Sequence, residues 1–253
     1  MSRRRKILIG SLIIFIVATS IFLVWAETPL GPMPEAIVAL QSNDKVLVST
    51  DKWLVFQPKT SLKFVGFIFY PGGRVNPRSY APAAHAIAEK GYLTVIVPMP
   101  LNLAVFGAEI ASDVIAAYPE IKVWAIGGHS LGGTMAAQYA RKYPSKIGGL
   151  ALWASYPSSS DDLSDQNIQV VSIYGTRDGL VTSKNIADSH ILLPSSTTWM
   201  PIEGGNHAQM GWYGPQPGDN DATISREVQQ IQVVNATLLM LENIEIDSVL
   251  SLN

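Results

Sequence analysis

The sequence predicts an α/β domain with a mostly parallel β-sheet that helices cover on both faces, preceded by one N-terminal transmembrane helix. Three observations predict this class. Short runs of β-branched and aromatic residues alternate with helical patterns, most of these runs are apolar throughout, and an uncharged stretch of 19 residues, 7–25, precedes them. Strands that are apolar throughout are buried on both faces. Alternation of such strands with helices gives a parallel sheet covered by helices.

The composition indicates a folded chain with one large core. Of the 253 residues, 47% are hydrophobic and 15% are charged, which is too apolar for a disordered protein. Residues 27–253 carry 14 basic and 20 acidic side chains, a net charge of −6. Nucleic-acid binding needs clustered basic residues, so we expect no nucleic-acid partner. The chain has no cysteine, which excludes disulfides, thiolate catalysis and cysteine-ligated zinc.

The amino terminus has the pattern of a membrane anchor. Four basic residues precede the apolar stretch: Arg3, Arg4, Arg5 and Lys6. As a helix the stretch would be roughly 28 Å long, enough to cross a bilayer. The positive end stays in the cytoplasm, so the sequence predicts an extracytoplasmic domain. The alternative is a signal peptide cleaved after Ala26, which would leave a secreted protein.

The chain divides into three parts. Residues 1–26 are the anchor or signal segment, and residues 27–45 are a linker that leads into the domain, dense in helix breakers up to Pro34. Residues 46–253 form the predicted α/β domain, which contains the candidate catalytic residues. The patterns predict strands over 46–49, 53–56, 64–70, 93–97, 123–126, 150–153, 170–174 and 198–201, the first two as an antiparallel hairpin. They predict helices over 78–90, 102–117, 131–143, 183–190 and 222–241.

The strongest motif surrounds a serine. Residues 128–133 read Gly-His-Ser-Leu-Gly-Gly, a G-x-S-x-G pattern between a predicted strand and a predicted helix. This setting is typical of a nucleophile on a strained turn, where small glycines let strand and helix pack closely. Ser130 is therefore the candidate nucleophile. The backbone N–H of Leu131 would lie at a helix N-terminus, where it can stabilise an oxyanion.

A serine nucleophile needs a histidine base and a carboxylate that orients it. Among the four histidines, His207 alone lies in a loop that follows a predicted strand after the serine. Asp178 directly follows the predicted strand 170–174. In a parallel sheet, reactive groups collect on loops at the carboxyl ends of strands. The chain order Ser130, Asp178, His207 is one of the known orders for such a triad.

A second oxyanion donor is expected in the loop after strand 64–70. There a Pro-Gly-Gly turn lets the backbone approach a ligand closely. The N–H of either Gly73 or Arg74 could be this donor. The Arg74 side chain could bind an anionic substrate group or could be a solvated arginine at the rim.

Together these residues resemble the α/β-hydrolase superfamily, specifically its small members similar to dienelactone hydrolase and compact esterases. The resemblance rests on residues 70–73 (Tyr-Pro-Gly-Gly), residues 128–133, Asp178 and His207 in their expected order. It implies that Ser130 attacks an ester carbonyl, His207 moves the proton and Asp178 orients His207. It implies no cofactor. No His-x-x-x-His or other clustered ligand spacing appears in the sequence, so we expect no metal site. Dienelactone hydrolase itself uses a cysteine nucleophile, so its lactone specificity does not carry over.

The substrate site is expected to be open. Many superfamily members insert a lid after the strand that follows the nucleophile helix, but only about a dozen residues lie between 153 and 168. Five side chains near strand ends are candidates for lining the site: Met99, Leu101, Asn102, Trp212 and Tyr213. An open site disfavours the buried channels of long-chain lipases.

The sequence therefore predicts an exported serine hydrolase of carboxylic esters, with a small-molecule ester as substrate. An acyltransferase or a peptidase would share the same triad, so both stay open as alternatives. A membrane-tethered binding domain without catalysis is the alternative from another class.

Overall fold

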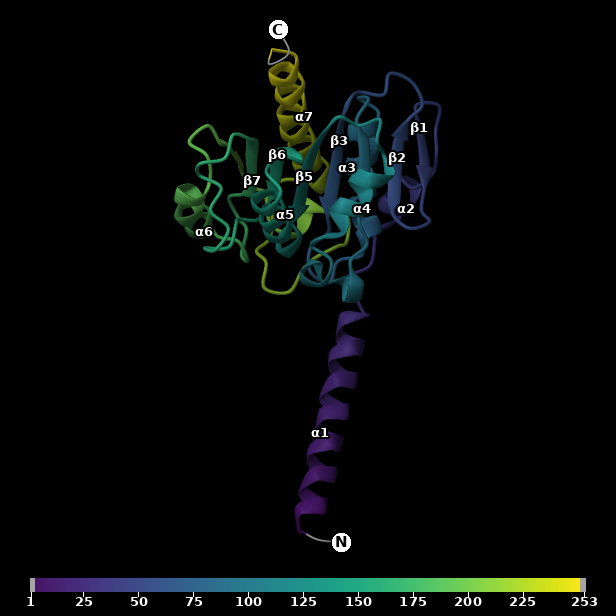
Figure 1. The fold of residues 1–253 in the computed structure, drawn as a ribbon, viewed down its shortest axis with the longest axis vertical. Coiled ribbons are helices and arrows are strands. Elements are labelled where there is room, and N and C mark those ends of the chain that lie inside the picture. The colour runs from purple at the N-terminus through teal and green to yellow at the C-terminus, as the bar shows by residue number, and fades with distance from the viewer. Residues whose placement is uncertain (1–2, 251–253) are drawn as a thin grey trace.

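The computed structural model describes residues 3–250 and contains an α/β domain with a long N-terminal helix that projects from it (Figure 1). Its eight-stranded sheet has the order β1-β2-β4-β3-β5-β6-β7-β8. β1 pairs antiparallel with β2, and β2 pairs antiparallel with β4, whereas all other neighbours are parallel. The strands are β1 (Val46–Ser49), β2 (Leu54–Pro58), β3 (Val65–Tyr70), β4 (Leu93–Ile96), β5 (Val123–His129), β6 (Ile147–Trp153), β7 (Gln169–Gly175) and β8 (Thr198–Ile202). The predicted fold class is confirmed.

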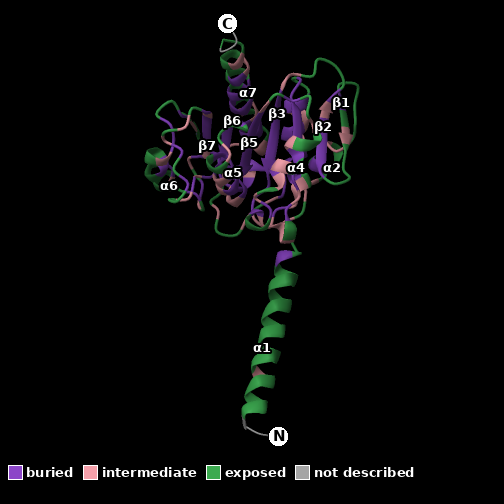
Figure 2. Cartoon of the chain, viewed as in Figure 1, coloured by how far each residue is buried: buried purple, intermediate pink, exposed green. Residues whose placement is uncertain are grey.

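Helices cover both faces of this sheet, and each face has its own apolar core. Successive residues of β3 point to opposite faces: Phe67 and Phe69 pack with α3 (Ala81–Ala88) and α7 (Arg226–Leu250), and Ile68 packs with α4 (Ile110–Ala117) and α5 (Leu131–Lys142). Every residue of β3 is buried, as expected for a strand with helices on both sides (Figure 2). The remaining helices are α1 (Arg3–Ala26), α2 (Pro34–Val38) and α6 (Ser183–Asp188).

Several predicted helices have different bounds. Over 102–117 only α4 is α-helical, because Leu101 and Asn102 have left-handed backbone angles and two short 3-10 segments follow Met99: η2 (Pro100–Asn102) and η3 (Ala104–Phe106). The helix predicted over 78–90 divides into η1 (Pro77–Tyr80) and α3.

The last helix and the linker also differ from the prediction. The expected helix 222–241 begins only at Arg226, where the Ser225 hydroxyl accepts the N–H of Val228, and it continues to Leu250 because Ile244 is still buried. The region 27–45 contains the short helix α2, which the breaker-rich sequence did not indicate. Proline at the first helical position is compatible with such a helix.

The order of the strands places a topological switch point at one edge of the sheet. β4 lies on one side of β3 and β5 on the other, so the connections after β3 and β5 run in opposite directions. At such a switch point the loops after the two strands diverge and leave room for a ligand. These loops begin at Pro71 and Ser130, and the site is therefore built there.

Candidate active site

Ser130 lies on a strained turn between β5 and α5. Its backbone has φ 51° and ψ −124°, in the left-handed half of the map, which non-glycine residues rarely adopt. The glycines around it make this turn possible. A Cβ on Gly132 would lie 2.2 Å from the Tyr70 carbonyl oxygen, and one on Gly128 would lie 2.5 Å from the backbone of Gly132. The turn leaves Ser130 partly exposed above the sheet.

The loop after β6 holds the turn from the other side. The Ser155 hydroxyl donates to the Ser130 carbonyl oxygen at 2.7 Å, and the Thr134 hydroxyl donates to the Tyr156 carbonyl at 2.9 Å. Loops from β5 and β6 are therefore tied together directly beside the serine. The connection from Ala154 to Ile168 contains no helix and does not cover the site as a separate lid domain.

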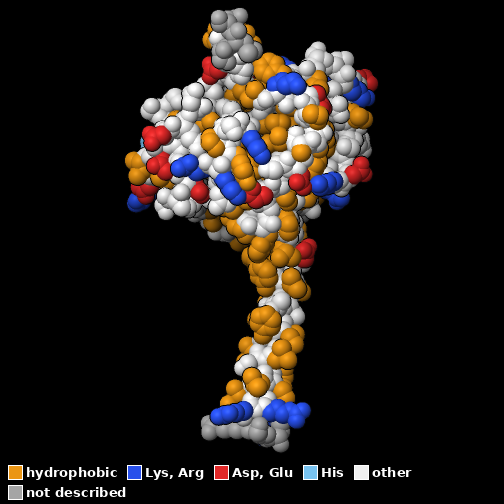
Figure 3. Space-filling view, in the orientation of Figure 1, with side chains coloured by type: hydrophobic (Ala, Val, Ile, Leu, Met, Phe, Trp, Pro, Cys, Tyr) orange, Lys and Arg blue, Asp and Glu red, His pale blue; other side chains and the backbone are white. Residues whose placement is uncertain are grey.

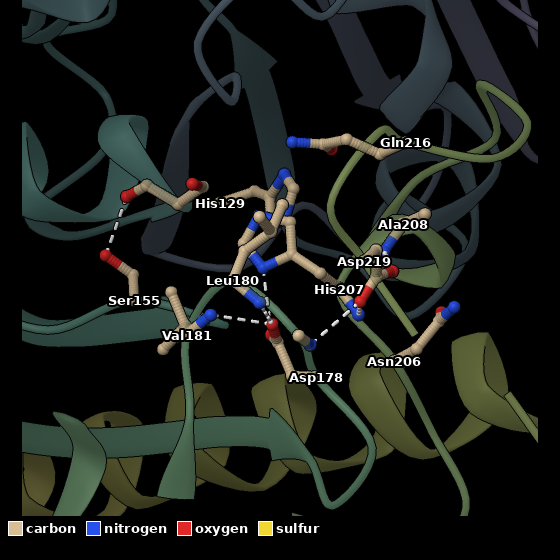
Figure 4. A network of polar contacts seen from close by, with 12 residues as sticks. His129, Ser155, Asp178, Leu180, Val181, Asn206, His207, Ala208, Gln216 and Asp219 are labelled. Carbon is tan, nitrogen blue, oxygen red and sulfur yellow. Dashed lines mark hydrogen bonds and ion pairs between the residues drawn. The ribbon is translucent and has the colours of Figure 1, made fainter. Parts of the chain in front are cut away.

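Asp178 and His207 form a buried pair on neighbouring loops after β7 and β8. Nδ1 of His207 donates to Oδ2 of Asp178 at 2.8 Å, and both side chains are fully buried. The other carboxylate oxygen of Asp178 accepts the N–H groups of Leu180 and Val181 at 2.8 and 2.7 Å (Figure 4). These bonds fix the carboxylate, and the carboxylate fixes the imidazole. Nε2 of His207 is buried and has no hydrogen-bond partner within residues 3–250.

Asp219, which the sequence analysis did not single out, joins these two loops. Its Oδ1 accepts the N–H of Gly179 at 3.0 Å and that of His207 at 3.3 Å, and its Oδ2 accepts the N–H of Ala208 at 2.8 Å. One carboxylate therefore fixes the Asp178 loop and the His207 loop relative to each other. Asp219 follows a Pro-Gly turn in a loop, and no pattern in a single sequence distinguishes it from a solvated aspartate.

Arg226 clamps the segment that follows His207. Its guanidinium donates to the carbonyl oxygens of Ala208, Gly211 and Gly214 from the first turn of α7. Burial lowers the pKa of Arg226 below its ordinary value. These hydrogen bonds fix the segment 208–214, which follows His207, against the start of α7.

A second histidine lies against the pair. The rings of His129 and His207 have centroids 4.4 Å apart. The Tyr80 hydroxyl accepts the N–H of Gly72 at 3.0 Å and lies 2.8 Å from Nδ1 of His129. The Tyr80 hydroxyl therefore links the loop after β3 to His129. Burial, together with the neighbouring His207, holds the pKa of His129 well below its usual range, so the ring is neutral.

The segments that carry the proposed oxyanion donors contact each other. A Cβ on Gly73 would be 3.2 Å from Cδ2 of Leu131, so the loop after β3 contacts the start of α5. Leu131 is the first residue of α5, where the backbone N–H has no partner within the helix. The N–H of Arg74, in contrast, donates to the Asn102 carbonyl oxygen at 2.7 Å.

The Arg74 side chain lies on the end of α1. Its Nε donates to the Trp25 carbonyl oxygen and its Nη2 to the Thr28 carbonyl oxygen, both at 2.7 Å, and the guanidinium stacks on the Trp25 ring at 4.3 Å. Asn102 also contacts this helix end, because its Nδ2 donates to the Ala26 carbonyl oxygen at 3.0 Å. Both side chains thus bind backbone of the N-terminal segment.

The other residues proposed to line the substrate site lie in different parts of the domain. Met99 is buried in the core beside α4 and α5. Trp212 lines a groove of about 350 Å³ between α3 and α7, whose lining includes neither Ser130 nor His207. The Tyr213 ring is buried 6.1 Å from the His129 ring, and its hydroxyl donates to Gln216. Leu101 is half-buried in η2.

Among the residues that the structure describes, no group of three or more His, Cys, Asp or Glu side chains has the arrangement of a metal site. The candidate groups at this edge of the sheet are the Ser130 hydroxyl, the buried Asp178–His207 pair and the backbone N–H groups of Leu131 and Gly73. Such a set can activate a hydroxyl and stabilise negative charge on an oxygen.

Comparison with known proteins agrees with the observed fold. Residues 66–231 match the model of an alpha/beta hydrolase family. No curated protein sequence matches the chain. An esterase from Pyrobaculum calidifontis superposes with a TM-score of 0.61 at 14% identity, covering 83% of this chain and 90% of the esterase.

Two further solved structures have the same fold. A CIB-like hydrolase from Thermoplasma acidophilum gives a TM-score of 0.56 at 16% identity, covering 78% and 98% of the two chains. An esterase from the planctomycete Thermogutta terrifontis gives 0.52 at 14% identity, covering 77% and 91%. The matched family model spans more than half of the chain, and the chain is accordingly a member of the alpha/beta hydrolase family.

Proposed function

We propose that the chain is a serine hydrolase of carboxylic esters that works through an acyl-enzyme. The observation that carries this proposal is the buried Asp178–His207 pair, whose free Nε2 lies on the same edge of the sheet as the strained Ser130 turn. Within the described residues Nε2 has no other group to bind, so it is available to the Ser130 hydroxyl. In unliganded enzymes this contact is often loose and tightens with substrate.

The reaction follows from these positions. His207 Nε2 accepts the Ser130 proton as Oγ forms a bond to the ester carbonyl carbon. The oxyanion receives hydrogen bonds from the N–H groups of Leu131 and Gly73. The Arg74 N–H is engaged with Asn102, which favours Gly73 as the second donor. The carbon–oxygen bond to the alcohol breaks, and His207 gives its proton to the leaving alcohol. Water then releases the acid by the same steps and regenerates Ser130.

Labelling with a fluorophosphonate tests the activated serine directly. The full-length chain in detergent should gain one adduct by intact mass, and Ser130→Ala should gain none. Ser159→Ala, which changes an exposed serine of the β6–β7 loop, is the matched control and should label like the wild type. A folded wild-type chain without an adduct would contradict the proposal and favour a binding domain without catalysis. A panel of esters, thioesters and peptides then separates ester hydrolysis from acyl transfer and proteolysis.

We further propose that α1 is a retained membrane anchor with the catalytic domain on the extracytoplasmic side. α1 is long and apolar enough to cross a bilayer, and its four basic residues precede the apolar stretch. Arg74 and Asn102 bind the carbonyl oxygens of Trp25 and Ala26, contacts that cleavage after Ala26 would remove. The intact mass of the membrane-extracted protein tests this, because loss of residues 1–26 would contradict a retained anchor.

A further inference from the structure

The end of α1 and the catalytic edge of the sheet are joined to each other. The carboxyl ends of β3 through β8 all lie at one edge, and α1 leaves the domain on that side (Figure 1). Arg74 follows the proposed oxyanion donor Gly73 directly, and it binds the Trp25 carbonyl oxygen at the end of α1 and the Thr28 carbonyl oxygen just after it. Leu30 pairs with Val75 in the same loop. The helix end therefore has a fixed position beside the site.

This connection sets the depth of the site relative to a bilayer. The apolar part of α1 ends at Trp25, and tryptophan prefers the boundary between hydrocarbon and headgroups. The headgroup layer on each side is roughly 5–8 Å thick. Arg74 stacks on Trp25 at 4.3 Å, so with α1 as the proposed anchor the oxyanion loop lies in or next to that layer. The ester groups of membrane lipids lie at this boundary, between the acyl chains and the polar headgroup.

The rim of the site nearest α1 is apolar. Val105 and Phe106 on η3 are exposed by 49% and 53%. η3 packs against α5, and the preceding η2 contacts α1, so this segment lies between the anchor and the Ser130 turn. Apolar side chains gather on the lower end of the domain where α1 emerges (Figure 3). Apolar side chains exposed beside a membrane helix bury apolar surface when they enter the boundary between headgroups and acyl chains.

We propose that the substrate is an ester-linked lipid of the leaflet next to the catalytic domain, attacked while its acyl chain stays in the bilayer. The proposal rests on the proposed ester hydrolase function. The bilayer, rather than a deep channel, holds the chain, which is consistent with the absence of a lid domain between β6 and β7 in the described structure. Val105 and Phe106 form the membrane-contacting rim over which the ester reaches Ser130.

The kinetic test uses the full-length chain in phosphatidylcholine vesicles and two esters of 4-methylumbelliferone, the bilayer-resident oleate and the water-soluble butyrate. The readout is the ratio of the oleate rate to the butyrate rate. Phe106→Asp should lower this ratio about tenfold, the factor that corresponds to about 1.4 kcal/mol of lost apolar contact. Leu62→Asp, which changes an apolar side chain exposed at the opposite edge of the sheet, should leave the ratio at the wild-type value.

The absence of cysteine allows a second readout that does not depend on catalysis. A spin label on Phe106→Cys in the same vesicles should be accessible to oxygen and shielded from a water-soluble nickel chelate, and a label on Leu62→Cys should show the reverse. Equal chelate access at both positions, or hydrolysis of the butyrate but not the oleate, would overturn the lipid-substrate proposal and leave the ester hydrolase function intact. Hydrolysis of neither ester, with no fluorophosphonate adduct on Ser130, would instead contradict the hydrolase function itself.

Discussion

Oδ2 of Asp178 and Nδ1 of His207 are 2.8 Å apart, in a pair from which solvent is excluded. An asparagine at position 178 presents either an amide N–H or a carbonyl oxygen to this nitrogen, and the first of these forces the wrong imidazole tautomer. Asp178→Asn should therefore lower kcat by about 10⁴-fold while the chain stays folded. Steady-state rates on a soluble ester measure this effect, with thermal unfolding as the check on folding. Rates near the wild type would assign the orienting role to another carboxylate.

A separate prediction concerns Asp219, whose carboxylate accepts backbone N–H groups of the Asp178 and His207 loops and does not contact the imidazole. Its removal frees the N–H groups of Gly179, His207 and Ala208, so the two loops can shift relative to each other. A displacement of roughly 1 Å costs about 10²-fold in rate, and we expect Asp219→Ala to lower kcat by about this factor.

The conservative variant distinguishes positioning from a loss of folding. Asp219→Asn keeps one acceptor oxygen and should recover part of the lost rate. Parallel losses of rate and of folded protein in both variants would mean that Asp219 acts on stability alone.

Gly132 tests the fit between the serine turn and the loop after β3. A Cβ there would lie 2.2 and 2.3 Å from the carbonyl oxygens of Tyr70 and Pro71, both backbone atoms. Gly132→Ala should push α5 away from this loop, lower the free energy of unfolding by about 1–3 kcal/mol and reduce kcat by separating the two oxyanion donors. Gly31→Ala, where a Cβ meets nothing within 4 Å, is the control and should match the wild type in denaturant unfolding and in rate.

The strands of the sheet are predicted well because the sequence pattern of a buried parallel strand is strong. Buried parallel strands such as 64–70 are apolar at every position, and all eight predicted strands overlap observed ones. The helix predicted over 102–117 was wrong in its first half because helical spacing does not report left-handed backbone at Leu101 and Asn102.

Within the site, the G-x-S-x-G motif, the predicted strand ends and the chain order placed Ser130, Asp178 and His207 on loops that the structure brings to one edge. Residues that act through long-range contacts were not predictable in this way. Tyr80 reaches His129 from 49 positions away, and Asp219 and Arg74 bind backbone groups that no local pattern identifies. Arg74 binds the end of α1 because the fold brings the loop after β3 next to that helix end. The periodicity of the sequence does not predict such a tertiary contact.

His129 predicts how stability depends on pH. Its pKa lies well below the usual value of 6.5 in the folded chain, because the buried ring is held neutral beside His207. Below pH 6.5 the unfolded chain binds a proton at this position that the folded chain does not bind, so this group makes stability fall as pH falls. Above pH 6.5 both states are neutral here and the contribution to the slope vanishes.

Between pH 6.5 and 5 the free energy of unfolding of the wild type should fall more steeply than that of His129→Gln, by up to about 1.4 kcal/mol per pH unit. The glutamine can still accept the Tyr80 hydroxyl. Urea unfolding of the detergent-solubilised full-length chain at several pH values measures both slopes. Parallel slopes for the two proteins would show that His129 binds protons equally in the folded and the unfolded chain, and the neutral buried ring would have to be abandoned.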